Sequence, residues 1–344
     1  MFKNNYLSSI TILIHTGENL KVGYGHLLYW LPEFFKSEIK FGILVRNKDL
    51  YKTIKNEYRT ISVFFAQDSL EVESVLNKFA NLKAIFYMSN SSNNIHLLRF
   101  NEYEHIFIGN ENYNRDMQTT KVLKAYDELW LQSQSIIEKI KCSIKDINNM
   151  KIVKIGKPQL KNVLNNEQKK SILCVFSIVD NVVINSIQLL INYSIKKNMK
   201  IKFVFSKLDK KNNKFSNNIE LQLKEILLRN KIESFVYTVF SDELLKESGF
   251  IVCDLNSYNE KFIINNIPVC VYRSYNFSTD MFLRNKDFPL EKTFLFSLFE
   301  ELQDYLMNDT CGEIPDEYTN YYLGKKYIID EKFQKEILRV GLCE

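Results

Sequence analysis

The segment Asp254-Leu255-Asn256-Ser257 has residue types that could bind a phosphate group. It follows an apolar run that we predict as a strand, and it precedes a helix predicted near Tyr258–Asn265. A helix N-terminus offers unpaired backbone N–H groups and a partial positive charge, which suit a diphosphate. Asn256 and Ser257 could each hydrogen-bond a phosphate oxygen, although Asp, Asn and Ser are also preferred N-capping residues. The pattern favours phosphate binding, with simple capping as the alternative.

A second polar turn, Gly109–Asp116, follows a run predicted as the strand His105–Gly109. Its Glu111 carboxylate could take a proton from a hydroxyl group, which is the work of a general base. Turns rich in Asn also form for reasons of backbone conformation alone. An ordinary surface loop is therefore the alternative to a substrate site here.

Histidines offer a further source of general-base chemistry, because imidazole titrates near neutral pH. His26 lies at the start of the first predicted helix, Leu27–Lys36, and His15 lies at the end of a predicted strand. Either side chain could be catalytic or structural, and the sequence favours the structural role for both.

The segment Asn94–Phe100 carries His96 and Arg99 between two predicted strands. Arg99 could hold a phosphate through paired N–H groups, which a lysine would do less specifically. The segment also contains three apolar residues, which favour a structural loop packed on the core. Both interpretations stay open at this point.

No set of His, Cys or Asp residues has the spacing of metal ligands, so we predict neither a metal nor another cofactor. The six cysteines are scattered, and Cys174, Cys253 and Cys270 lie in apolar runs. We expect buried, reduced thiols in a cytoplasmic protein.

The elements that would position these residues alternate apolar strand-like runs with amphipathic runs. In the first half, the predicted strands are Ile10–His15, Phe41–Arg46, Ser62–Ala66, Ala84–Met88, His105–Gly109, Glu128–Leu131 and Ile152–Ile155. In the second half, they are Ser171–Ser177, Lys200–Ser206, Phe235–Phe240, Gly249–Asp254 and Pro268–Tyr272. The helices predicted between them include Leu27–Lys36, Ser69–Ala80, Val182–Lys197, Ile219–Asn230 and Asp242–Ser248. This alternation indicates βαβ units and parallel sheets, an α/β fold class.

A chain of 344 residues is long enough for two domains. The polar segment Asn162–Lys170 separates the two series of strands and helices, so we place the link there. We predict domains at 1–165 and 166–290 and a C-terminal helical segment at 291–344, with helices at about Thr293–Met307 and near Asp330–Val340. Two such domains bind ligands at the carboxyl ends of their strands.

Composition and charge set further limits. A net charge of +5 is compatible with phosphate-bearing ligands or an anionic membrane surface, and equally with an ordinary basic surface. The aromatic residues follow core periodicity rather than alternating with Lys and Arg, which argues against nucleic-acid binding. No apolar run is long enough to span a bilayer, and the N-terminal residues lack the apolar core of a signal peptide. We expect a cytoplasmic protein that can make peripheral contact with the inner face of the membrane.

Three common motifs are missing. The chain has no Gly-x-Gly-x-x-Gly fingerprint and no Walker A loop, which argues against a dinucleotide-binding domain and a P-loop NTPase. It also lacks the Gly-x-Ser-x-Gly elbow of α/β-hydrolases.

Several segments of the first half together resemble one enzyme family. The run Asn94-Ile-His-Leu-Leu-Arg-Phe100, followed by His105-Ile-Phe-Ile-Gly109, resembles the CDP-glycerol glycerophosphotransferases, which are GT-B enzymes of teichoic-acid and capsule-type polymer synthesis. Lys121–Trp130, Val153–Leu160 and Tyr29–Pro32 are similar to further segments of that family. The resemblance is strong over residues 26–160 and looser over 171–275.

The resemblance implies a GT-B fold, with two Rossmann-like domains whose parallel sheets face each other across a cleft. It implies a transferase that moves a glycerol-phosphate or related group from a CDP-linked donor to a cell-surface polysaccharide, a teichoic-acid-like polymer or a lipid-linked acceptor. The donor contacts implied in the second domain are Asp254, Asn256, Ser257 and Lys207. The acceptor contacts implied in the first are Asn112, Arg115, Asn94, His96 and Arg99. The catalytic candidates are Glu111, Asn110 and His26.

The chain departs from the family where the chemistry is expected. The family's His-Gly-Asp-Ser-Asp-Lys reads Asn110-Glu-Asn-Tyr-Asn-Arg115 here, and no histidine follows His105. Two alternatives therefore remain. One is a GT-B glycosyltransferase that uses a sugar nucleotide, with Glu111 as the base. The other is a non-catalytic relative that binds a nucleotide.

Overall fold

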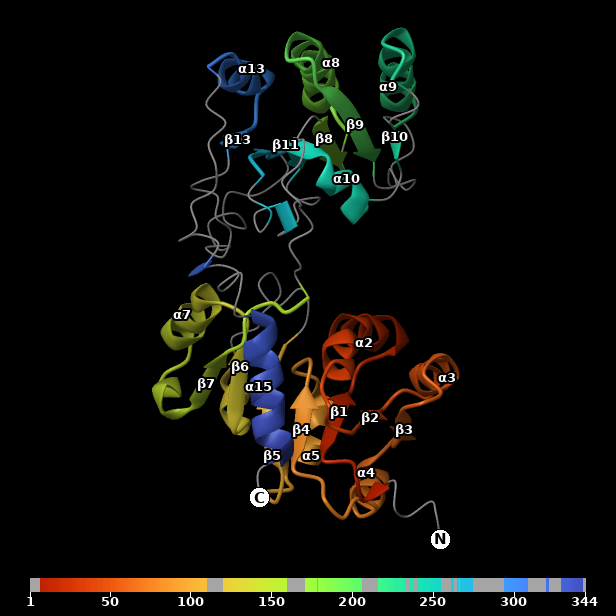
Figure 1. Ribbon diagram of the computed structural model, residues 1–344, viewed down its shortest axis with the longest axis vertical. Coiled ribbons are helices and arrows are strands. Elements are labelled where there is room, and N and C mark those ends of the chain that lie inside the picture. Colours follow the sequence, from red (N-terminus) through yellow and green to blue (C-terminus); the bar gives the residue numbers. More distant parts are fainter. Residues whose placement is uncertain are drawn as a thin grey trace. The chain divides into compact units, whose positions relative to one another are not determined.

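The computed structural model describes residues 7–109, 120–159, 171–177, 179–205, 216–232, 236–237, 240–254, 261–262, 265, 267–274, 294–308, 320–321 and 329–342. The chain forms two compact units, one of residues 1–159 with 320–344 and one of residues 160–319. Each unit has a parallel sheet with helices packed on it (Figure 1). The predicted class, two α/β domains with parallel sheets, is confirmed. The domain boundaries predicted at 165 and 290 stay predictions.

The sheet of the first unit has the strand order β3-β2-β1-β4-β5-β6-β7. Its strands are β1 (Ile12–Thr16), β2 (Phe41–Val45), β3 (Ser62–Phe65), β4 (Ala84–Tyr87), β5 (Glu104–Phe107), β6 (Glu128–Leu131) and β7 (Lys151–Lys154). Every neighbouring pair is parallel. The order reverses between β1 and β4, and such a switch point is where doubly wound sheets bind ligands.

Helices cover both faces of this sheet. They are α2 (Leu20–Phe35), α3 (Lys48–Glu57), α4 (Ser69–Leu76), α5 (Ile95–Leu98), α7 (Gln134–Ser143) and α15 (Ile329–Leu342), with short 3₁₀ turns at Ser92–Asn94, Lys121–Ala125 and Ile147–Asn149. Successive residues of β1 enter different cores: Leu13 packs with α4 and α7, whereas Ile12 and Ile14 pack with α2, α3 and α15. The strands are therefore buried on both faces, which explains their continuous apolar runs.

Helix α2 corrects the predicted helix Leu27–Lys36. It begins at Leu20, seven residues earlier, and the Asn19 side chain caps it by accepting a hydrogen bond from the Val22 N–H at 3.1 Å. Gly23 and Gly25 weaken the helical signal in the sequence, because glycine costs backbone entropy in a helix. His26 therefore lies inside the helix and not at its start.

Helix α15 comes from the end of the described chain and completes the core of the first unit (Figure 1). The Phe333 ring stacks on Trp30 at 5.2 Å and meets Trp130 edge-on at 5.9 Å. Arg339 pairs with the buried Glu128 carboxylate at 2.6 Å. The same carboxylate also accepts a hydrogen bond from Lys151 at 2.7 Å. Aromatic stacking and a charged hydrogen bond thus fix both halves of the helix.

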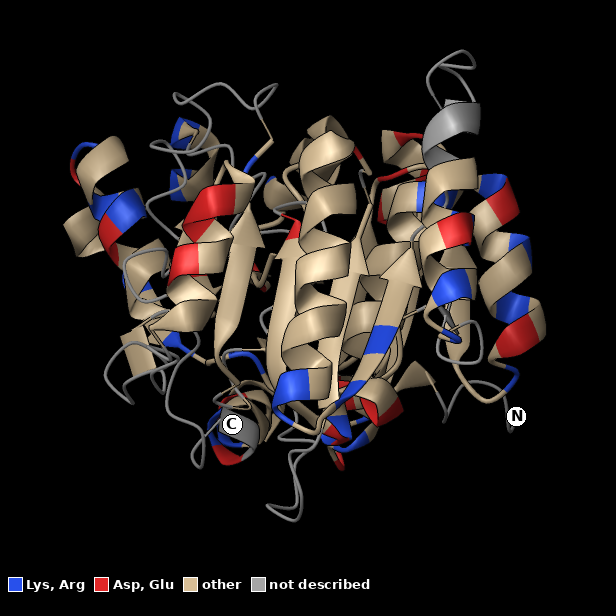
Figure 2. Cartoon of the chain, turned by 90° about the horizontal axis from the view of Figure 1, so that it is seen from above, with Lys and Arg blue, Asp and Glu red and all other residues tan. Residues whose placement is uncertain are grey.

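The sheet of the second unit has the order β10-β9-β8-β11-β12-β13, again with parallel pairs throughout. Its strands are β8 (Ser171–Phe176), β9 (Lys200–Phe205), β10 (Val236–Tyr237), β11 (Ser248–Asp254), β12 (Val269–Tyr272) and β13 (Phe294–Phe296). Its helices are α8 (Asn181–Lys196), α9 (Ser216–Arg229), α10 (Asp242–Lys246) and α13 (Phe299–Met307). The long central helix α8 carries no charged residue before Lys196 and is tan along most of its length in Figure 2.

The helix predicted at Thr293–Met307 is also corrected. Phe294–Phe296 forms the edge strand β13, and the helix begins only at Phe299. The Glu301 carboxylate accepts hydrogen bonds from the Ser297 and Leu298 N–H groups at 2.6 and 3.1 Å, which fixes this start. The apolar run Phe-Leu-Phe pairs with β12 instead of extending the helix.

Among the described residues, no helix combines the length and apolar character needed to cross a bilayer. The cysteines at 142, 174, 253 and 270 are all free thiols, and burial raises the pKa of Cys174 and Cys253.

Candidate functional site

The loops that follow β1 and β4 meet at the carboxyl edge of the first sheet. Asn93 donates from its side chain to the Gly17 carbonyl at 2.9 Å, and the Ser89 hydroxyl donates to the Glu18 carboxylate at 2.9 Å. A Cβ atom at Gly17 would lie 2.5 Å from the Ser91 hydroxyl oxygen, so only glycine allows this approach. The two loops are thus joined at the switch point of the sheet.

His26 lies two turns into α2, beside this junction. Burial lowers the pKa of its imidazole, and the nearby Glu18 charge partly offsets that effect. The ring is therefore neutral at pH 7, and its buried Nδ1 has no hydrogen-bond partner among the described residues. A neutral imidazole next to a carboxylate that is itself held by Ser89 can accept a proton and be stabilised once charged.

His15, at the end of β1, is a different kind of histidine. It is fully buried and meets the Tyr87 ring edge-on at 5.6 Å. Burial, followed by the positive charge of Arg46, lowers its pKa to about 3. Neither ring nitrogen makes a hydrogen bond of good geometry with a described residue. His15 is a neutral core residue, out of reach of a substrate in this conformation.

His96, predicted as a substrate contact, is held by a buried arginine. Arg46 donates to His96 Nδ1 at 2.9 Å and to the Ala66 and Gln67 carbonyls at 2.6 and 2.9 Å. Because the arginine can only donate, His96 Nδ1 accepts, and the ring proton is on Nε2. Arg46 thereby ties α5 to the ends of β2 and β3.

The other two predicted contacts of this segment are engaged within the protein. Asn94 is buried and donates to the Ser89 carbonyl at 2.7 Å and to the Tyr126 hydroxyl at 2.9 Å. Arg99 lies at the surface, where it pairs with Glu73 at 3.0 Å. Segment Asn94–Phe100, predicted as a loop, contains the short helix α5. Substrate binding by Asn94, His96 or Arg99 stays a prediction.

The end of β5 is held from α2. Trp30 donates its indole N–H to the Gly109 carbonyl at 2.8 Å, and Gly109 has a φ of 69°, which favours glycine. The predicted site residues that follow it lie outside the described residues: Asn110, Glu111, Asn112 and Arg115.

In the second unit, Asp254 ends β11 and is buried. Its carboxylate accepts hydrogen bonds from the Ser177 N–H at 2.5 Å and the Ser177 hydroxyl at 2.8 Å, which joins the loops after β8 and β11. The carboxylate thus holds these two loops together, and a phosphate contact by Asp254 stays a prediction. The other predicted donor contacts, Asn256, Ser257 and Lys207, lie outside the described residues.

A second carboxylate caps α8. Asp180 accepts from the Val183 N–H at 3.0 Å and from the Tyr272 hydroxyl at 2.6 Å. This hydrogen bond acts together with burial, the larger cause, to raise the pKa of Tyr272. The α8 N-terminus already has a negative partner, so a phosphate is disfavoured there.

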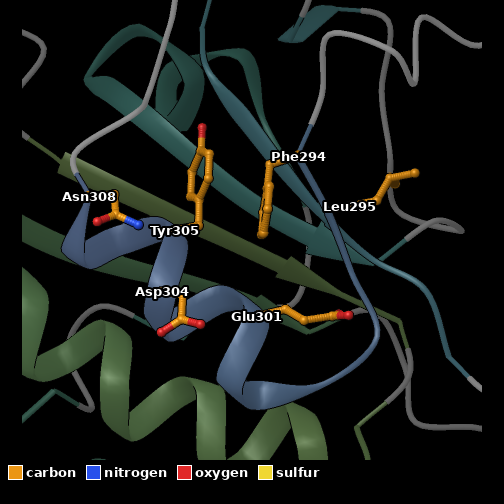
Figure 3. Close-up of a pocket in the computed structure, with 6 residues that line it drawn as sticks. All are labelled: Phe294, Leu295, Glu301, Asp304, Tyr305 and Asn308. Atoms are coloured by element: carbon orange, nitrogen blue, oxygen red, sulfur yellow. The ribbon is translucent and has the colours of Figure 1, made fainter.

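A pocket of about 380 Å³ lies between β13 and α13 in the same unit (Figure 3). Phe294 and Tyr305, whose rings stack on each other at 4.0 Å, line one part of it, and Glu301 and Asp304 add negative charge. Two carboxylates repel phosphate, so the pocket does not suit a nucleotide diphosphate. Within the described part of the chain, no group of three His, Cys, Asp or Glu side chains could hold a metal ion.

Sequence reasoning identified His26 but missed Glu18, Ser89 and Arg46. The signal for Glu18 was the turn Gly17-Glu18-Asn19 directly after a buried strand, where ligand-binding loops of α/β proteins begin. Ser89 has no such signal, because its bond to Glu18 spans 71 residues and depends on the pairing of β1 with β4.

No protein-family model and no curated protein matches the chain. Solved structures do match over nearly the full length. UDP-GlcNAc 2-epimerase from Methanocaldococcus jannaschii has a TM-score of 0.56 at 14% identity, covering 95% of this chain and 98% of that one. A glycosyltransferase from Rickettsia africae has a TM-score of 0.52 at 12% identity, covering 97% and 99%. The lipopolysaccharide outer core galactosyltransferase WaaB has a TM-score of 0.51 at 9% identity, covering 95% and 98%.

At these identities the similarity establishes the fold alone. The chain has the GT-B type of fold, with two Rossmann-like domains, as predicted. Membership of the CDP-glycerol glycerophosphotransferases is not established by these matches and stays a prediction.

Proposed function

We propose that this chain is a GT-B-type transferase that moves a group from a nucleotide-linked donor to an acceptor hydroxyl, with His26 as general base. The observation that carries the proposal is the place of the half-buried His26, whose pKa is lowered by burial, near the Glu18 carboxylate that Ser89 holds where the loops after β1 and β4 meet. Fold similarity alone does not determine function.

The chemistry requires one proton transfer and one displacement. His26 takes the proton of the acceptor hydroxyl as its oxygen forms a bond to the transferred group. The bond from that group to the donor phosphate breaks, and its electron pair leaves with the nucleotide. Glu18, held by Ser89, stabilises the imidazolium that forms. General-base help of this kind contributes about 10²–10⁴-fold to the rate.

The donor would bind to the second unit. In support, one structurally similar enzyme is named for UDP-GlcNAc, a nucleotide-linked sugar. The α8 N-terminus is occupied by Asp180, so the donor phosphates are assigned to the segment after β11, with Asn256 and Ser257 as their contacts. Asp254 then acts as a positioning residue through Ser177.

Two classes of donor remain candidates. The resemblance over residues 26–160 favours a CDP-linked donor and a teichoic-acid-like or capsule-type acceptor, with Arg115 and Lys207 balancing the leaving charge. A sugar nucleotide is the alternative. In either case Glu111 is the competing candidate for the base.

Two measurements test the proposal, first nucleotide binding and then turnover of the donor. Thermal unfolding is measured with CDP, UDP and GDP, since saturation at a hundredfold excess over Kd adds about 2.7 kcal/mol of stability. Release of nucleotide from CDP-glycerol and UDP-GlcNAc is then followed for the wild type and for His26→Asn, with circular dichroism to show that the variant is folded.

We expect one nucleotide to stabilise the protein, and we expect the folded His26→Asn variant to bind that nucleotide but to lose turnover. Full turnover in His26→Asn would overturn the role of His26 and leave Glu111 as the base. Nucleotide binding with no turnover of any donor would favour a non-catalytic relative.

A further inference from the structure

A series of hydrogen bonds ends at Asn90, which is partly exposed at the carboxyl end of β4. The series begins at the Ser89 carbonyl, which accepts from Asn94 Nδ2 at 2.7 Å. The same nitrogen donates to the Tyr126 hydroxyl at 2.9 Å, and that hydroxyl donates to Asn90 Oδ1 at 2.9 Å. The Asn94 and Tyr126 residues are 2% and 3% exposed, so the series is buried up to its last member.

The direction of these bonds fixes the orientation of the Asn90 amide. A carbonyl can only accept, so the Asn94 atom that meets Ser89 must be the amide nitrogen. The second N–H of this nitrogen donates to the Tyr126 oxygen, and the single hydroxyl proton of Tyr126 is then directed to Asn90. The Asn90 atom that receives this proton is the carbonyl oxygen. The N–H donors of Asn90 therefore point away from Tyr126.

The Tyr126 side chain is held firmly enough to keep this orientation. Its ring lies 5.1 Å from the Tyr87 ring and 5.1 Å from the Phe107 ring, measured between centroids. Burial raises the pKa of Tyr126 to about 12, so the hydroxyl keeps its proton at neutral pH. A protonated hydroxyl on a packed ring holds the Asn90 amide in one position.

The donors of Asn90 lie in the loop that also belongs to the candidate site. Within the described part of the chain, no group accepts a hydrogen bond from Asn90 Nδ2. Ser89, the preceding residue, donates to the Glu18 carboxylate at 2.9 Å, and the Glu18 charge acts on His26. A pair of oriented donors is thus available at the edge of the sheet where we place the acceptor.

We propose that Asn90 binds the acceptor substrate by donating from its amide nitrogen to an oxygen of that substrate. Hydroxyl and phosphate oxygens can both accept such a bond. Asn94 and Tyr126 are then positioning residues, because they act on the substrate only through Asn90. An amide that is held in advance loses less rotational freedom on binding, which favours affinity. The inference rests on the proposed function for the placement of the acceptor on the first unit.

Saturation-transfer NMR on the full chain, without nucleotide, tests the proposal. The probes are glycerol and glycerol 3-phosphate, and we expect the wild type to bind at least one of them. Asn90→Ala should weaken that binding about three- to tenfold, which corresponds to the loss of one hydrogen bond.

Asn90→Asp distinguishes the two kinds of oxygen. This variant keeps an oxygen that accepts from Tyr126 but replaces the N–H donors by a negative charge. If Asn90 binds a phosphate, Asn90→Asp should weaken the binding of glycerol 3-phosphate more than Asn90→Ala does, because like charges repel. If it binds a hydroxyl, Asn90→Asp should retain more affinity for glycerol than Asn90→Ala, because a hydroxyl can also donate to a carboxylate.

Asn81→Ala is the matched control. Asn81 precedes the amino end of β4, and its amide nitrogen donates to the Ser8 carbonyl at 2.6 Å. The control should bind the probes as the wild type does, and circular dichroism should show that each variant is folded.

Two results would overturn the proposal: binding of neither probe to the wild type, or equal affinity in Asn90→Ala and the wild type. Probe binding that depends on Asn90, in a chain that turns over no donor, would support this inference and reject the proposed transfer. Turnover that depends on His26, with probe binding that does not depend on Asn90, would do the reverse.

Discussion

Trp30 and Gly109 are joined by a hydrogen bond of 2.8 Å from the indole N–H to the carbonyl oxygen, across 79 residues of sequence. This bond fixes the residue that directly precedes Asn110 and Glu111. Trp30→Phe keeps an aromatic side chain but removes the indole N–H, and it leaves a buried carbonyl without this donor. We expect it to lower the free energy of unfolding by about 1–3 kcal/mol and to reduce donor turnover. Urea unfolding and the nucleotide-release assay measure the two effects.

Trp130→Phe is the matched control for this prediction. Trp130 is equally buried, but its indole donates to Glu128 at 2.8 Å, at the amino end of β6. Glu128 keeps Lys151 and Arg339 as partners. The control should retain turnover, and an equal loss in both variants would show that Trp30 acts through stability alone.

Gly23 and Gly25 lie two residues apart in α2 and should respond oppositely to alanine. A Cβ at Gly23 would lie 2.7 Å from Leu50 Cδ2 and 3.1 Å from Thr16 Oγ1, whereas at Gly25 nothing lies within 4 Å. Gly25→Ala should stabilise the protein by about 0.4–1 kcal/mol through the unfolded state. Gly23→Ala should destabilise it by about 1–3 kcal/mol. Thermal melts of both variants check the pair, and destabilisation by Gly25→Ala would contradict it.

His15 makes stability depend on pH. Its pKa is about 3 in the folded chain, against 6.5 for the free side chain. Because the unfolded chain takes up this proton first, the contribution of His15 is complete above pH 6.5 and is lost as the pH falls towards 3. The expected slope is up to about 1.4 kcal/mol per pH unit. Urea unfolding between pH 7.5 and 4.5 should show a shallower slope in His15→Leu, and an unchanged slope would contradict the prediction.

Phe333 should contribute most of the energy by which α15 docks. Its side chain is fully buried between the two tryptophans. Phe333→Ala should cost about 3–5 kcal/mol of unfolding free energy and shift the tryptophan fluorescence. Leu342→Ala, on the same helix at 62% exposure, should stay within about 0.5 kcal/mol of the wild type. Similar losses in both variants would contradict this account of docking.

The strands of the first sheet were predictable to within one or two residues. A run such as that of β1, in which every residue is buried, fits only a strand covered on both faces. Two predicted helix starts were wrong, because local residue preferences there differ from the structure that tertiary packing favours. The glycines in the first turns of α2 weakened the helical pattern there, so the predicted start was too late. The short run Phe294–Phe296 was predicted as part of the helix that follows it, although it forms the strand β13.

The residue types of the candidate site were only partly predictable from the sequence. His26 was identifiable by residue type, but its neutral state depends on burial within the fold. The contact of Ser89 with Glu18 requires that β1 and β4 be neighbours, although β2 and β3 separate them in the chain. Such a contact carries no local pattern. The same holds for Arg46, which looks like the polar end of a strand until α5 places His96 against it.

The return of α15 to the first unit also sets the order in which the protein can be completed on the ribosome. Strands β1 to β7 leave the exit tunnel first, but the apolar surface around Trp30, Phe34 and Trp130 lacks its cover until Phe333 has been synthesised. The whole second unit is made in between. The nascent chain therefore carries an exposed aromatic surface during that time, and the unit that begins first is the last to close.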